Sequence, residues 1–155
     1  MKKIGEFTAR GSLQNGSNFK INLFDGRFDT AHKIVDFKIS TDNVTDVQAT
    51  AAKVTMTRKL PSRGELWDWG DNNEIAWAFA KIGAGTSQVS HDVDYYIDPE
   101  NLLVEDCWVQ VYTSDAATDN VNYMITFEKY EISEALGATS MARDRSGSSG
   151  SNWIQ

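Results

Sequence analysis

The stretch from Leu102 to Ile132 constrains the fold more than any other part of the chain, because it holds two runs of β-forming residues. The first run, 102–112, is rich in β-branched and aromatic side chains. In the second run, 121–132, apolar residues fall on one face, namely Val121, Tyr123, Ile125 and Phe127. This period of two is typical of a half-buried antiparallel strand. Because a polar connection joins the two runs, the sequence predicts a long hairpin whose apolar face another sheet or helix must cover.

Six further strand candidates precede this stretch, at 2–10, 19–24, 32–39, 47–59, 75–82 and 93–97. Turn signals separate them, among them Asp25-Gly26 and Asp98-Pro99. In 75–82, large and small residues alternate, which favours a strand buried on both faces. About eight short strands without a convincing helix predict an all-β fold, an antiparallel sandwich or a single jelly roll.

The chain divides into two parts near residue 133. Residues 1–133 hold all the strand candidates and form the predicted sandwich domain. Residues 134–155 are rich in Gly and Ser and end in an apolar tip, so we expect a flexible C-terminal arm.

Composition limits the partners. A net charge of −7 disfavours direct binding of nucleic acid. The longest apolar run, 75–80, is far below the roughly 20 residues of a membrane helix, and residues 1–7 lack the hydrophobic region of a signal peptide. The one cysteine, Cys107, excludes an intramolecular disulfide, and we expect it to be a buried small hydrophobe.

No catalytic motif is present. We expect His32 and His91 to be exposed or in loops, without a nucleophile motif nearby. The Asp/Asn-rich segment 68–74 offers oxygen ligands for calcium, but such runs are also common in turns and the EF-hand spacing is missing. The sequence therefore predicts a protein that is not an enzyme and has no cofactor or bound metal, with the calcium question in 68–74 left open.

Trp67 and Trp69 are the sharpest candidates for partner binding. In an extended segment both indoles lie on one side, where they could stack on sugars or anchor a partner protein. The alternative is that they close one end of the sandwich.

The end of the arm is the second candidate. Trp153 and Ile154 are either part of an inconsequential terminus or an anchor that docks on a neighbouring subunit. Arg143 and Arg145 would then pair with acidic surface on that neighbour.

Three segments, Ile21-Asn22-Leu23-Phe24-Asp25-Gly26, Ile97-Asp98-Pro99 and Val121-Asn122-Tyr123, give the chain a resemblance to small uncharacterised β-rich proteins of marine bacteriophages. The resemblance implies a compact β domain with an extended arm that serves in a virion as a capsid, decoration or tail protein. It assigns no site residues.

Together these features predict a non-enzymatic virion structural protein that assembles with copies of itself and with other virion proteins, without contacting nucleic acid or membrane. The alternative is a carbohydrate-binding β-sandwich in which Trp67 and Trp69 hold a glycan.

Overall fold

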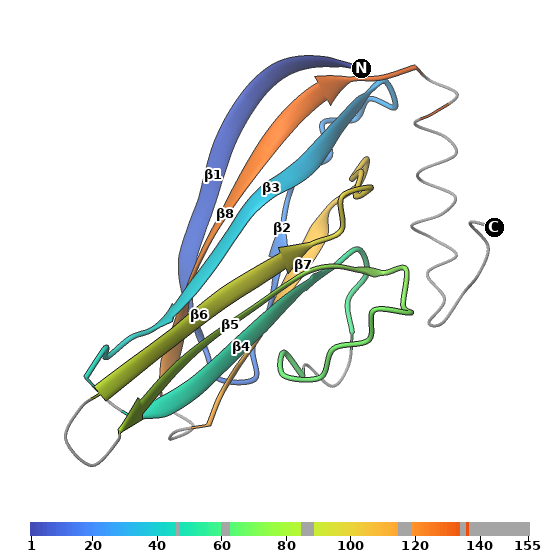
Figure 1. Ribbon diagram of the computed structural model, residues 1–155. Helices are drawn as coiled ribbons and strands as arrows, with labels where there is room; N and C mark the ends of the chain where they lie inside the picture. The colour runs from blue at the N-terminus through green and yellow to red at the C-terminus, as the bar shows by residue number, and fades with distance from the viewer. Residues whose placement is uncertain (46, 60–62, 85–88, 115–118, 134–135, 137–155) are drawn as a thin grey trace.

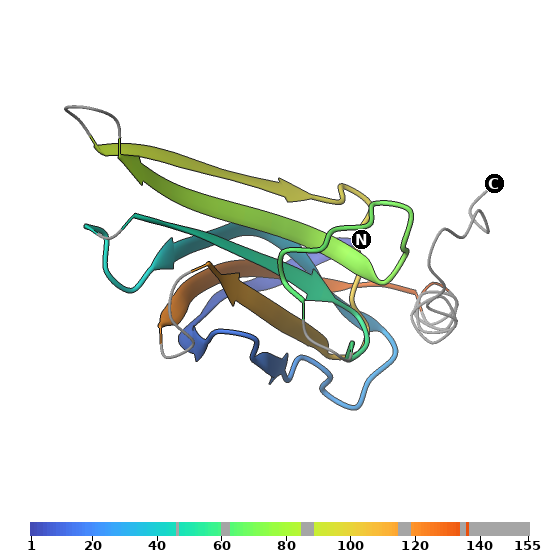
Figure 2. The ribbon, with the colours of Figure 1, turned by 90° about the horizontal axis from the view of Figure 1, so that it is seen from below.

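The computed structural model describes residues 1–45, 47–59, 63–84, 89–114, 119–133 and 136; for residues 84 and 89–91 only the backbone is considered. Two antiparallel sheets pack face to face (Figures 1 and 2), which confirms the predicted all-β sandwich. One sheet has the order β1-β8-β3 and the other β2-β7-β4-β5-β6. The strands are β1 (Lys2–Gln14), β2 (Asn18–Ile21), β3 (Thr30–Thr41), β4 (Gln48–Thr55), β5 (Glu74–Ala84), β6 (Val89–Ile97), β7 (Cys107–Thr113) and β8 (Asn120–Glu131).

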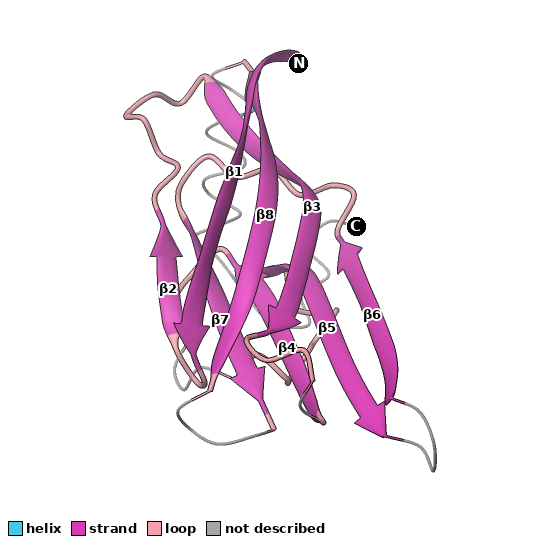
Figure 3. Cartoon of the chain, turned by 90° about the vertical axis from the view of Figure 1, so that its left-hand side faces the viewer, coloured by secondary structure: helices cyan, strands magenta, loops and turns pink. Residues whose placement is uncertain are grey.

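The strand pairs are nested, as in a jelly roll: β1 pairs with β8, β2 with β7 and β4 with β5. The nested order would also pair β3 with β6. Here β6 contacts β3 but forms its ladder with β5 instead (Figure 3). As a result, β6 is an edge strand of the larger sheet.

The predicted hairpin between the last two strands is wrong. The strand β7 pairs with β2 and β4, whereas β8 pairs with β1 and β3 in the other sheet. The polar connection therefore crosses from one sheet to the other. The two strands still cover each other's apolar faces, but through the core and not through a shared ladder.

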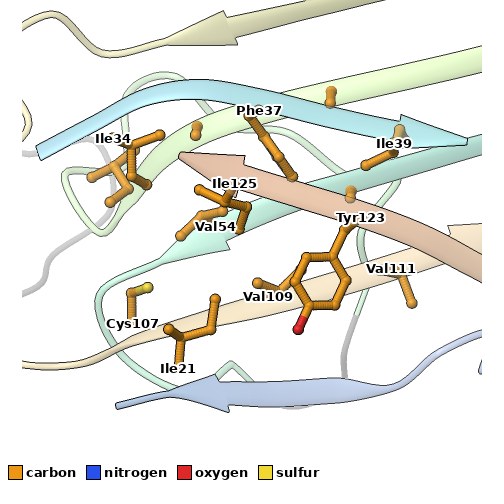
Figure 4. Packing of buried hydrophobic residues seen from close by; sticks show 14 of the residues in the cluster. Ile21, Ile34, Phe37, Ile39, Val54, Cys107, Val109, Val111, Tyr123 and Ile125 are labelled. Carbon is orange, nitrogen blue, oxygen red and sulfur yellow. The ribbon is translucent and has the colours of Figure 1, made fainter. Parts of the chain in front are cut away.

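The core lies between the sheets and follows the predicted alternation (Figure 4). All four apolar residues predicted on one face of β8 are buried, and Val109 and Val111 of β7 face them. Cys107 is fully buried among them, as predicted, and burial raises the pKa of its thiol.

Local irregularities explain two differences from the expected pattern. In an uninterrupted strand Val35 would share the inward face of Phe37 and Ile39, but it is exposed because the register shifts between Ile34 and Asp36. The strand predicted at 2–10 continues as β1 to Gln14. Gly11 suits this close pairing, because a Cβ there would lie 3.0 Å from the ring of Tyr123.

The expectation for His32 was also wrong. This residue lies within β3 and is buried, with its ring edge-on to Phe7 at 5.6 Å. Burial, and then the positive charge of Lys129, lower the pKa of the imidazole. The backbone of His91 lies in β6, but its side chain is outside the described part of the chain.

The predicted arm lies outside the described residues except for Leu136, and so do Arg143, Arg145, Trp153 and Ile154. Within the described ranges, no helix is long and apolar enough to cross a membrane.

Candidate functional site

The connection between β4 and β5 folds back over the outer face of the larger sheet, where its residues 63–73 cover β5 (green in Figure 1). Gly64 fixes one end of this loop against β7, because a Cβ at Gly64 would lie 2.6 Å from the backbone oxygen of Gln110. The indole Nε1 of Trp67 donates a hydrogen bond to the Gly64 carbonyl at 2.9 Å. The loop thus gives β5 its second buried face, as the large-small alternation predicted.

The register of β4, β5 and β6 places three side chains in a row on the sheet beneath the loop. Lys53 on β4 is opposite Trp77 on β5, and Trp77 is opposite Tyr96 on β6. Since residues opposite each other point to the same face of a sheet, these three side chains form one row under the loop.

Glu74 holds the loop to this row. Its Oε2 accepts a hydrogen bond from Lys53 Nζ at 3.0 Å. Its Oε1 accepts from the backbone N–H of Asp68 at 2.9 Å and from Trp77 Nε1 at 3.0 Å. Lys53 Nζ also donates to the carbonyl oxygen of Leu66 at 2.7 Å. Both charged side chains are buried, so the loop conformation depends on a desolvated ion pair.

The two candidate tryptophans play different parts. Trp67 is half-buried and packs against Phe79 and Tyr96, with ring centroids 6.3 Å away in each case. Trp69 is 65% exposed, although its ring contacts Tyr96 at 5.6 Å and Trp77 at 5.7 Å. Both lie on the outer face of the larger sheet, so neither closes an end of the sandwich. Trp67 is a packing residue, and Trp69 is the one available to a partner.

A groove of about 380 Å³ opens beside Trp69 and is called the Trp69 groove below. Aromatic rings and carboxylates dominate its lining, which consists of Trp69, Asp71, Asn72, Glu74, Trp77, Tyr96, Ile97, Asp98 and Pro99. None of these described lining residues is basic. The groove can therefore offer ring faces for stacking together with hydrogen-bond acceptors.

The acidic residues of the loop do not converge on one point. Asp71 forms an ion pair with Lys59, and its other oxygen accepts the backbone N–H of Asn73 at 2.9 Å. Asp68 Oδ1 accepts the backbone N–H of Gly70 at 2.9 Å. Across the described ranges, no three His, Cys, Asp or Glu residues are grouped so that they could hold a metal ion. The structure therefore gives the calcium alternative no support.

The sequence pointed to this loop through its paired tryptophans, but it did not identify the rest of the groove. Tyr96 and Trp77 were visible only as strand residues, and the register that places them side by side is set by long-range pairing. The buried Lys53 had no sequence signal, because an isolated lysine in a strand normally faces solvent.

Fold and site together define an antiparallel β-sandwich with nested strand pairs and an aromatic groove on its larger sheet. No protein-family model, curated protein or solved structure matches the chain.

Proposed function

We propose that this protein is a non-enzymatic structural subunit of a virion, as a capsid, decoration or tail component, and that it acts by assembling with copies of itself. The observation that carries the proposal is a band of exposed apolar side chains at the edge strand β6. Tyr96, together with Trp69 and Leu66 of the neighbouring loop, lies on the outer face, and Val93 and Tyr95 lie on the core-facing side. We call this band the β6 surface. Apolar side chains that stay exposed at an edge strand are typical of protein–protein contacts.

The position of the β6 surface supports assembly further. Because β6 is an edge strand, one side of its backbone has no partner strand among the described residues. Val93 is 63% exposed, although it lies opposite Ala80 on the core-facing side of β5. Although β3 contacts β6, Val93 and Tyr95 stay exposed on this face, so a second molecule is the natural cover.

The nested strand order and the resemblance to phage proteins agree with this role. Jelly-roll sandwiches are common subunits of viral capsids, where repeated symmetric contacts add up to a stable shell. The same architecture also serves lectins, so the fold alone does not select the function.

The mass of the full-length protein tests the proposal. Light scattering across a concentration range should show a defined oligomer for the full chain. If residues 138–155 contribute to assembly, a version ending at Gly137 should form an oligomer with fewer copies, or a monomer. A full chain that stays monomeric at every concentration contradicts self-assembly.

The Trp69 groove favours one second candidate, a carbohydrate-binding module. Sugars stack on exposed indoles, and their hydroxyls donate hydrogen bonds to carboxylates and exchange hydrogen bonds with amides; Trp69 lies beside Asp71 and Asn72. Quenching of tryptophan fluorescence by a glycan, abolished by Trp69→Ala, would support this function. A broad glycan panel without any response would contradict it.

A further inference from the structure

We propose that the Trp69 groove of one copy binds the C-terminal residues 138–155 of a second copy. Trp153 and Ile154 would lie against the aromatic rings, and Arg143 and Arg145 would lie beside the acidic rim. This inference rests on the proposed assembly function and names the contact that would carry it.

The chemistry of the groove fits this segment. Trp69, Trp77 and Tyr96 offer ring faces to an indole and an aliphatic side chain. Two of the groove's carboxylates, Glu74 and Asp71, form ion pairs with Lys53 and Lys59. The carboxylates of Asp98 at the rim and of Asp94 on β6 add negative charge at the surface. A segment with two arginines and an apolar end complements this combination.

The place where the described chain ends also supports docking in the Trp69 groove. Ile132, just after β8, packs in a small cluster with Ala31 and Val104, and Leu102 lies against that cluster. The same connection between β6 and β7 begins with Asp98 and Pro99, which line the groove. The last described strand therefore ends against the connection that begins at the groove. The 17 residues that lead from Leu136 to Trp153 would span about 21–25 Å as a flexible Gly/Ser-rich chain.

We assign the docked segment to a second copy because one docked segment leaves much of the exposed apolar surface at β6 uncovered. A single docked tryptophan buries roughly 150–250 Å², far less than the roughly 1,200 Å² of a stable interface. Leu66, Val93 and Tyr95 would stay exposed if the segment merely folded back onto its own domain. An exchanged segment would instead bring a second domain next to the edge strand β6, where Val93 and Tyr95 lie exposed on the face opposite the groove.

Binding of a peptide tests the recognition step. The chain ending at Gly137 retains every residue of both core clusters, which extend from Ile21 to Ile132, so it contains the complete sandwich. A synthetic peptide of residues 138–155 should bind this protein by calorimetry. Trp69→Ala should weaken binding by about thirtyfold or more, the usual effect of losing a central tryptophan. The matched control is Phe19→Ala, an exposed aromatic on β2 at the opposite edge of the sheet, and it should leave binding unchanged.

The full-length chain tests the exchange between copies. Its oligomer should dissociate in the Trp69→Ala variant and in a Trp153→Ala/Ile154→Ala variant, and it should persist in Phe19→Ala. If the peptide binds but the full chain is always monomeric, the segment occupies its own groove and the exchange is refuted. If the oligomer persists in Trp69→Ala and the peptide does not bind, the groove assignment is refuted while assembly itself stands.

Discussion

The ion pair under the site loop gives the sharpest test of how this structure is held together. Glu74→Gln keeps the shape of the side chain and an oxygen for the Asp68 N–H and Trp77 Nε1, but it leaves Lys53 without its counter-charge. Removing one partner of a buried ion pair typically costs 3–5 kcal/mol. We expect about 3 kcal/mol, the lower end, because Lys53 keeps its hydrogen bond to the Leu66 carbonyl.

Urea unfolding followed by circular dichroism measures this loss directly. For a domain of this size the same change lowers the melting temperature by about 6–12 °C. The double variant Lys53→Met/Glu74→Gln removes both charges and should recover most of the loss, because no uncompensated charge stays buried. A Glu74→Gln protein within about 0.5 kcal/mol of wild type would refute this account. A double variant as unstable as the sum of the single variants would also contradict it.

Two further predictions concern buried positions. Because burial and Lys129 lower the pKa of His32 below 6.5, the unfolded chain takes up a proton more readily, and stability should fall as pH drops below about 6.5. His32→Phe should remove that part of the pH dependence in thermal melts, and an unchanged profile would refute the assignment. Gly64→Ala should cost about 2 kcal/mol in urea unfolding because its Cβ would meet the Gln110 backbone, whereas Gly5→Ala, with its nearest neighbour at 3.9 Å, should cost far less. Equal effects of the two glycine variants would contradict the close approach at Gly64.

The alternation of residues determined which face of each strand is buried. In β8 the period of two placed Tyr123 and Ile125 in the core, and in β5 the large-small alternation indicated burial on both faces. The Asp25-Gly26 turn was equally readable, since Gly26 adopts a φ of +84° that other residues rarely tolerate. These features depend on local backbone geometry, which residues adjacent in the sequence determine.

Pairing partners were decided only by the tertiary structure. A polar loop between two strands is compatible with a hairpin and with a crossing between sheets, and the chain takes the crossing between β7 and β8. The inward position of His32 likewise depends on its edge-on packing against Phe7 and Phe127, residues far away in sequence that stack on each other.

The candidate site shows the same division. The sequence by itself determined that Trp67 and Trp69 belong to an unusual loop rich in turn residues. Only the tertiary structure decided that Trp67 is packed while Trp69 is exposed, because Lys53 and Glu74 join across the sheet and fix where the loop lies. Periodicity encodes the side to which a residue points, but it carries no information about which distant strand will lie there.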